Sequence, residues 1–306
     1  MVAYIFPGQG AQYVGMGKDF YDNSSAARKV FNKADALLGF AISKLCFEGP
    51  QDLLARTDKA QLAILVTSVA SLEAFRQKNS DIKADFTAGL SLGEYSALVA
   101  AGALSFEDSL NLVKKRAGIM RGVSEKNPGK MLAVIGLDAA IIDKLCGEAG
   151  IEVANRNCPG QLVVTGRKED IDKFYALASK EGAKRLIELE VSGAFHSRLM
   201  EEARLRLAEE LKDIHFKLPS TISVVSNVTA RPFSSTDEIR NNLALQVRSS
   251  VLWEDSMRYM LSFGVKSFFE IGPGKVLKGL ARKIDSGLQV VSIEKMEDIN
   301  LVAGNH

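Results

Sequence analysis

The chain has 306 residues, of which 46% are hydrophobic and 25% charged, and its formal net charge is +2. This composition is that of a globular protein with a sizeable core, and the small net charge provides no general attraction to nucleic acid or to a membrane surface. The three cysteines are scattered without C-x-x-C spacing, which argues against a disulfide framework and a zinc site and favours a reducing compartment.

A short apolar segment at the start of the chain predicts a buried strand over Val2–Phe6. It has no basic residues before it and is too short for a signal peptide, and no window reaches the roughly 18 uninterrupted apolar residues of a membrane span, so we expect a cytoplasmic protein. The glycine-rich loop over residues 7–12 lacks the spacing of a dinucleotide-binding loop or a phosphate loop. It remains a flexible loop whose amides can contact a ligand at the carboxyl end of a strand.

The strongest local signal is Gly89-Leu90-Ser91-Leu92-Gly93. An apolar run precedes it and a segment of helical composition follows it, so we predict a strand, a tight turn and a helix. In this setting G-x-S-x-G is typical of a nucleophile elbow, which holds the serine hydroxyl at the end of the strand. The N–H of Leu92, in the first helical turn, can then face an oxyanion. An ordinary glycine-serine turn is the alternative.

Two amphipathic helices are predicted on either side of this turn. Thr57 is expected to cap a core helix over residues 58–79. Ser105 and Asp108 resemble a capping box that starts the second helix. On that helix Arg116 lies on an apolar stripe, so its guanidinium either binds an anion or reaches water or a helix carbonyl while its stem packs on the core.

After residue 126 the order of the predicted elements changes to β-α-β-β-α-β, which is the order of a ferredoxin-like unit. The predicted strands cover residues 131–135, 151–154, 162–165 and 184–191, and the predicted helices cover 138–148 and 168–179. We therefore predict a small ferredoxin-like α+β domain, residues 127–190, inserted into a large α/β domain made of residues 1–126 and 191–306. A cleft is expected between the two.

His196 is the strongest candidate for a general base. It follows the predicted insertion and precedes a charged helix over residues 198–212, which Ser197 can cap. A cationic imidazole is disfavoured beside the positive end of a helix, so we expect a neutral ring; a surface histidine is the alternative. The other two histidines are His215, in a turn-to-strand stretch, and His306, the last residue.

The last third of the chain again alternates strands with helices, which predicts a large α/β-hydrolase-like domain with a mainly parallel sheet covered on both faces. Strands are predicted over residues 222–226, Ser267–Ile271 and 288–293, and helices over 235–247 and 251–263. A short helix near the end carries Lys275, Lys278 and Arg282 on one face. This face is either simply solvated or meets an acidic partner.

Together, Ser91 as nucleophile, His196 as base and the N–H groups of Gln9 and Leu92 as oxyanion donors would form an acyl-transfer site. No aspartate stands out as the third member of a hydrolase triad, so a backbone or amide carbonyl could orient the imidazole instead.

The assembled motifs closely resemble one family, the malonyl-CoA:acyl carrier protein transacylases, which are the stand-alone acyltransferases of fatty-acid synthesis. They run in family order along nearly the whole chain: Phe6-Pro7-Gly8-Gln9-Gly10-Ala11-Gln12, Gly89-Leu90-Ser91-Leu92-Gly93-Glu94, Arg116, Asn157-Cys158-Pro159-Gly160-Gln161, Gly193-Ala194-Phe195-His196-Ser197, Gln246 and Glu270-Ile271-Gly272-Pro273-Gly274-Lys275.

The resemblance implies a two-step ping-pong transfer. Ser91 takes malonyl from coenzyme A as an ester and then gives it to the phosphopantetheine thiol of acyl carrier protein. The resemblance further implies that His196 is the general base and acid, that Gln246 supplies the carbonyl that holds its ring, and that Gln9 and Leu92 provide the oxyanion amides.

By the same resemblance, Arg116 pairs with the malonyl carboxylate, Phe195 rejects branched acyl groups, and Asn157 and Gln161 line the pantetheine cleft. The acidic partner of the basic face would be the carrier protein. We expect no metal, no permanently bound cofactor, no nucleic-acid or membrane partner, and a monomer.

Two positions depart from the family pattern. Leu90 stands where many members have histidine, and Ser250 stands where a proline is usual ahead of Trp253. Without the proline, the backbone near Ser250 is less fixed, and the match of Gln246 to the family position is weaker.

Three alternatives stay open. A serine thioesterase or esterase would give no reason for Arg116 or for an inserted domain. An acyltransferase of polyketide synthesis would use a different carrier. A catalytically silent module that binds carrier protein would have no need to retain both Ser91 and His196.

Overall fold

The first strand, β1 (Val2–Phe6), lies in the middle of a five-stranded parallel sheet of order β7-β2-β1-β8-β9. In the computed structural model, which describes residues 1–191 and 193–303, Ala3 and Ile5 belong to one hydrophobic cluster and Tyr4 and Phe6 to another. Both faces of the strand are therefore buried, which explains its continuous apolar sequence. The other strands are β2 (Phe86–Gly89), β7 (Ser223–Val224), β8 (Ser267–Ile271) and β9 (Gln289–Ile293).

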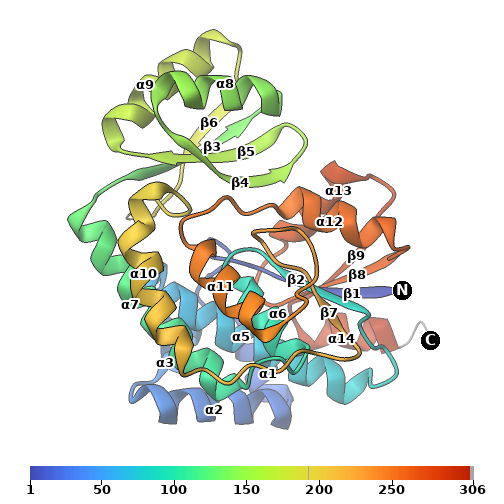
Figure 1. Cartoon of the computed structure of the whole chain (residues 1–306). Coiled ribbons are helices and arrows are strands. Elements are labelled where there is room, and N and C mark those ends of the chain that lie inside the picture. The colour runs from blue at the N-terminus through green and yellow to red at the C-terminus, as the bar shows by residue number, and fades with distance from the viewer. Residues whose placement is uncertain (192, 304–306) are drawn as a thin grey trace.

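Helices cover both faces of the parallel sheet (Figure 1). One face packs against α12 (Trp253–Ser262) and α13 (Val276–Ile284). The other packs against α5 (Thr57–Lys78), which is buried along most of its length. The remaining helices of this part are α1 (Lys18–Asn23), α2 (Ser25–Leu38), α3 (Ile42–Glu48), α4 (Gln51–Ala55), α6 (Gly93–Ala100), α7 (Phe106–Lys126), the 3₁₀ turn η1 (Arg198–Met200), α10 (Glu201–Lys212), α11 (Thr236–Gln246) and α14 (Met296–Ala303).

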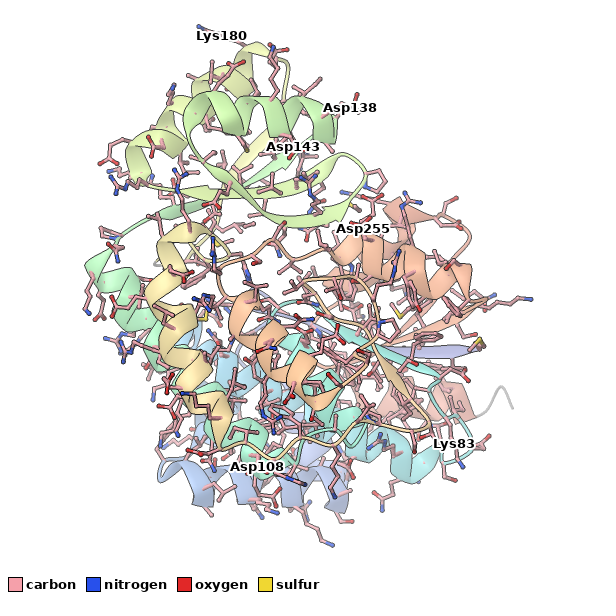
Figure 2. All side chains as sticks on the ribbon, viewed as in Figure 1. Lys83, Asp108, Asp138, Asp143, Lys180 and Asp255 are labelled. Carbon is pink, nitrogen blue, oxygen red and sulfur yellow. The ribbon has the colours of Figure 1, made fainter. Side chains whose placement is uncertain are left out.

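Four further strands form an antiparallel sheet of order β4-β5-β3-β6. They are β3 (Lys130–Ile135), β4 (Glu152–Cys158), β5 (Gln161–Gly166) and β6 (Arg185–Glu188). One face packs under α8 (Ala139–Ala149) and α9 (Lys168–Lys180), and Lys180 at the end of α9 lies on the outside of the molecule (Figure 2). The opposite face, with Met131 and Val163, joins the core of the parallel part.

Backbone hydrogen bonds also fix this sheet to the rest of the molecule. The Val251 N–H donates to the Ala154 carbonyl at 2.8 Å, and the Val251 carbonyl accepts from the Arg156 N–H at 2.9 Å. The segment ahead of α12 thus pairs with the edge strand β4. Because this segment follows α11 directly, the contact also holds the end of that helix in place.

The predicted fold class, a mainly parallel sheet with helices on both faces plus a small ferredoxin-like sheet, is confirmed. Several predicted boundaries are wrong. Strand β4 continues to Cys158, and β6 ends at Glu188. Thr57 is the first residue of α5 and not its cap. The helix expected from residue 198 begins as a 3₁₀ turn. In the described ranges, no helix is long and apolar enough to cross a membrane.

Candidate active site

Ser91 lies in the turn between β2 and α6, at the carboxyl end of the parallel sheet. Its φ of 51° is a left-handed conformation, which costs a non-glycine residue of the order of 1–3 kcal/mol. The turn is tight: a Cβ on Gly93 would lie 2.2 Å from the Phe6 carbonyl oxygen, and one on Gly8 would lie 2.4 Å from the Leu90 carbonyl oxygen. The two glycines therefore let the loop after β1 pack directly on the elbow.

Asn227 holds this strained turn from the segment that follows the neighbouring strand, β7. Its Oδ1 accepts from the Ser91 N–H at 2.7 Å, and its Nδ2 donates to the Gly89 carbonyl at 2.7 Å. One buried amide thus fixes both sides of the turn. Asn227 is not among the predicted site residues, although it directly follows the strand predicted over 222–226, and the carboxyl ends of parallel strands are where ligand sites form.

Ser91, His196 and Gln246 come together in a hydrogen-bonded row. The Ser91 Oγ lies 2.8 Å from Nε2 of His196, and Nδ1 of His196 lies 2.8 Å from the Gln246 backbone carbonyl. A carbonyl only accepts, so Nδ1 carries the proton and Nε2 is left to accept from the serine hydroxyl. In this arrangement the imidazole can withdraw the hydroxyl proton and activate the serine. The other two histidines are not part of the row: His215 lies between α10 and β7, and His306 falls outside the described residues.

The ring of His196 is neutral, as expected, but for a different reason. Burial and the nearby Arg116 cation lower the pKa of His196 from 6.5 to about 4. Ser197 accepts from the Leu199 N–H at 3.3 Å, which caps only the 3₁₀ turn η1. Loss of water around the ring and a neighbouring positive charge, rather than the start of a long helix, therefore keep the imidazole available as a base.

We expect the imidazole of His196 to titrate near pH 4. The chain has three histidines, so its carbon-bound imidazole protons can be followed by NMR, and His196→Gln identifies the signal by its loss. Because the pKa of His196 is lower in the folded than in the unfolded chain, the unfolded chain binds this proton first as the pH falls. The neutral His196 therefore adds to the free energy of unfolding above about pH 6.5, and this contribution is lost as the pH falls towards 4. A midpoint near 6.5 in the folded protein would contradict this account.

Arg116, on α7, is 1% exposed and its guanidinium faces Ser91. Nη1 donates to Gln61 Oε1 at 2.5 Å, and Nη2 donates to Gln246 Oε1 at 2.9 Å and to Ser91 Oγ at 3.2 Å. Among the described residues no carboxylate forms an ion pair with it, and Nε has no partner. Of the two predicted alternatives, a guanidinium that reaches water or a helix carbonyl is therefore wrong, and the site holds a buried cation beside the nucleophile. Gln61 was expected only as part of a core helix.

Of the two predicted oxyanion donors, Gln9 lies in the loop after β1 and Leu92 lies in the elbow on which that loop packs. Within the part of the chain that the structure describes, neither the Gln9 N–H nor the Leu92 N–H has a hydrogen-bond partner. Both are therefore free to donate to a ligand oxygen. The side chain of Gln9 donates to Thr57 Oγ1 at 3.3 Å, so Thr57 anchors this loop in place of its expected role as a helix cap.

The remaining predicted residues lie around this centre or away from it. Phe195 is buried in the main core directly before His196. Asn157 is buried at the end of β4, and its Oδ1 has no partner among the described residues. Gln161 Oε1 accepts from Lys283 Nζ at 2.6 Å, so this side chain contacts α13. Despite the serine at position 250, the carbonyl of Gln246 reaches His196.

The basic residues predicted as a docking face lie on and next to α13, on the surface. Lys275 immediately precedes this helix, and its Nζ lies 3.6 Å from Glu294. In residues 1–191 and 193–303, Lys278 and Arg282 have no carboxylate partner. They are one helical turn apart, so two uncompensated cations share one face.

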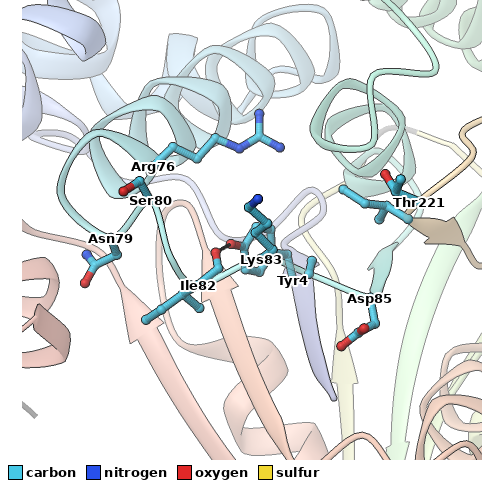
Figure 3. A pocket seen from close by; sticks show the side chains of 10 residues that line it. Tyr4, Arg76, Asn79, Ser80, Ile82, Lys83, Asp85 and Thr221 are labelled. Atoms are coloured by element: carbon cyan, nitrogen blue, oxygen red, sulfur yellow. Dashed lines mark hydrogen bonds between the residues drawn. The ribbon is translucent and has the colours of Figure 1, made fainter. Parts of the chain in front are cut away.

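A hollow of about 440 Å³ lies at the opposite end of the parallel sheet (Figure 3). Lys83 and Asp85 of its lining precede β2, whereas Ser91 follows β2. Arg76, also in the lining, donates to the Ala100 carbonyl and pairs with Glu73. The hollow contains none of the predicted site residues. Over the described ranges, no group of three or more His, Cys, Asp or Glu side chains could hold a metal ion.

Comparison with known proteins gives one consistent result. The chain matches the acyl transferase domain family over residues 3–302. It is 44% identical over 305 residues to the malonyl CoA-acyl carrier protein transacylase of Bacillus subtilis, with 98% of this chain and 95% of that protein covered. The crystal structure of MCAT from Streptococcus pneumoniae has a TM-score of 0.94 and 38% identity, with both chains fully covered. A malonyl-transacylase solved in complex with its type II PKS acyl-carrier protein has a TM-score of 0.95 and 34% identity, covering 100% of this chain and 99% of that one.

Proposed function

The chain belongs to the acyl transferase family, and on this premise we propose that it transfers malonyl from malonyl-CoA to the phosphopantetheine thiol of acyl carrier protein. The single observation that carries the proposal is the buried guanidinium of Arg116, which lacks a carboxylate partner among the described residues and lies 3.2 Å from the Ser91 hydroxyl. A site of this kind suits an acyl group that ends in a carboxylate. The names of the relatives agree with this substrate.

The reaction proceeds in two steps. Ser91 Oγ attacks the thioester carbonyl while its proton passes to Nε2 of His196, and the N–H groups of Gln9 and Leu92 stabilise the oxyanion. The thiol of coenzyme A leaves with that proton, and a malonyl ester remains on Ser91. In the second step His196 takes the proton of the carrier thiol, which attacks the ester, and returns it to Ser91. The backbone carbonyl of Gln246 holds the ring throughout.

Transfer, as opposed to hydrolysis, requires the ester to survive until the second thiol arrives. Arg116 clamps the malonyl carboxylate and fixes the acyl group, which limits the geometries in which water can attack. A simple esterase would gain nothing from this buried cation. Phe195 restricts the space near the α-carbon, and Asn157 and Gln161 line the approach of the pantetheine arm.

The proposal is tested by the intact mass of the protein after exposure to malonyl-CoA without carrier. We expect a stable gain of one malonyl group, which peptide mapping locates on Ser91. Steady release of free malonate without accumulation of the adduct would support the thioesterase alternative. Failure to form any adduct would support a silent carrier-binding module.

The proposal extends to domains, substrates and location. Residues 127–190 form a domain inserted between residues 1–126 and 191–306, and the site lies between them. The coenzyme A thioester is a substrate, and no cofactor is bound permanently. The location is cytoplasmic, which suits three cysteines that are all buried as free thiols.

We expect charge reversal on the basic face of Lys275, Lys278 and Arg282 to weaken the use of carrier protein. Replacing these three residues by glutamate should raise the KM for carrier protein about tenfold, because acidic partners are steered and held by such charges. Acylation of Ser91 by malonyl-CoA should not change. Lys180→Glu, on the outer side of α9, is the control. Unchanged carrier kinetics in the triple variant would dismiss this face, and the carrier then docks elsewhere.

A further inference from the structure

Glu94, on α6 close to Ser91, has no task in the reaction described above, yet it is fully buried. Its Oε1 accepts from the Asn227 N–H at 3.0 Å, and its Oε2 accepts from the side-chain amide of Gln246. A buried carboxylate is costly unless hydrogen bonds and an opposite charge compensate it. Both of its oxygens point to residues that shape the active site.

The side chain of Gln246 connects this carboxylate with the only cation beside Ser91 in the described structure. Its Oε1 accepts from Arg116 Nη2 at 2.9 Å, and its Nε2 donates to Glu94 and, at 3.0 Å, to the Ser91 carbonyl. The positive and negative groups thus lie at opposite ends of one amide, whose dipole both charges orient in the same direction. Arg116, Gln246 and Glu94 are each at most 1% exposed. Water therefore does not screen the arrangement.

We propose that Glu94 is a positioning residue for acyl transfer. It orients the Gln246 amide towards Arg116 and supplies the negative charge that balances Arg116 until a substrate carboxylate arrives. This inference rests on the proposed malonyl transfer. When the malonyl carboxylate binds Arg116, one guanidinium would have to balance two negative charges, one in direct contact and one beyond the Gln246 amide. The substrate carboxylate contacts the cation directly, so Glu94 is the group that takes up a proton from solvent.

The groups around Glu94 determine the pH at which this happens. Burial raises the pKa of Glu94 to about 7, against the lowering effects of the Asn227 and Gln246 hydrogen bonds and the Arg116 charge. A carboxylate on Arg116 offsets that charge and raises the pKa further. Tyr95 and His196 are the other titratable groups close to Arg116, with pKa values raised to about 12 and lowered to about 4, respectively. Neither changes its protonation near neutral pH, so the proton goes to Glu94.

Isothermal titration of malonyl-CoA into the Ser91→Ala protein tests this, because binding then occurs without transfer. Repeating the titration in buffers of different ionisation enthalpy counts the protons taken up. At pH 7.5 to 8 we expect uptake approaching one proton per site with malonyl-CoA and none with acetyl-CoA. The affinity for malonyl-CoA should also fall by up to about tenfold per pH unit above 7, whereas that for acetyl-CoA should stay constant.

Glu94→Gln in the same background should abolish the proton uptake. Each Glu94 oxygen accepts from a different donor, and a glutamine would place an NH2 group against either the Asn227 N–H or the Gln246 amide, so the Gln246 amide loses its fixed orientation. Glu270→Gln is the matched control, since Glu270 is also fully buried but accepts from the Leu277 and Lys278 N–H groups at the start of α13. Proton uptake on binding of malonyl-CoA by the Glu270→Gln variant should equal that of the Ser91→Ala parent protein.

Malonyl-CoA binding without proton uptake would overturn the inference, and so would equal uptake in the Glu94→Gln protein. If that variant does not fold, the contrast between malonyl-CoA and acetyl-CoA in the pH dependence of affinity decides on its own. The wild-type protein keeps the two proposals apart. If it forms the malonyl ester but binding takes up no proton, only the role of Glu94 fails; if no ester forms, the proposed function fails.

Discussion

Replacing Ser91 by alanine is expected to abolish the malonyl adduct and to slow transfer to carrier protein by about 10⁴-fold or more. The Ser91 hydroxyl lies 2.8 Å from a neutral imidazole and 3.2 Å from a buried guanidinium. The imidazole activates this oxygen and the guanidinium lies beside it, so the substitution removes both interactions at once. Intact mass spectrometry and carrier transfer assays measure the two effects separately.

The control for this variant is Ser96→Ala. Ser96 lies on α6, the helix that follows Ser91; it is fully buried, and its Oγ has no partner among the described residues. Removing it leaves no hydrogen-bond partner unsatisfied, so acylation should persist. A malonyl ester that still forms in the Ser91→Ala protein would show that another residue is the nucleophile.

Most of the fold is predictable because its signals are local. Strand β1 is apolar throughout since both faces are buried, and Ser105 and Ser235 begin α7 and α11 by accepting from the N–H three residues on, as their sequence patterns predict. Helices α1, α3, α4 and α14 have at most eight residues and are stabilised mainly by packing, which a sequence does not display. Helix α2 is different: Ser24 caps its start and Gly39 its end, so it could have been predicted.

The site divides in the same way. Ser91 and His196 stand in recognisable local patterns, and Arg116 is conspicuous as a cation on an apolar stripe. Gln61 gives no such signal, and Glu94 stands out only as the last residue of the motif around Ser91, with no role assigned to it. Their roles come from hydrogen bonds across helices, and on their own helices both are simply polar residues. The low pKa of His196 likewise depends on burial of the ring and on a guanidinium that the sequence places 80 positions earlier.

The second large effect is expected from Arg116→Ala, which should change the preferred substrate. Without the guanidinium, the malonyl carboxylate would be buried beside Ser91 with no partner. We therefore expect the transition state for malonyl transfer to lose about 3 kcal/mol or more of stabilisation, so that kcat/KM for malonyl-CoA falls by a factor of at least about 100. Acetyl-CoA has no carboxylate to leave unpaired, so its kcat/KM should be unchanged or higher. The ratio of the two values, from competition between both donors, is the measurement.

Two features of the site decide how that ratio must be read. Arg116 lowers the pKa of His196, so its removal raises that pKa, and assays at pH 8 ensure that the base stays neutral in both proteins. Lys115→Ala, which removes the neighbouring exposed cation paired with Glu210 at 2.5 Å, controls for the loss of one positive charge from α7. If Arg116→Ala reduced acetyl and malonyl transfer equally, the guanidinium would serve Ser91 or His196 and not the acyl carboxylate. Only an effect confined to malonyl places the carboxylate on Arg116.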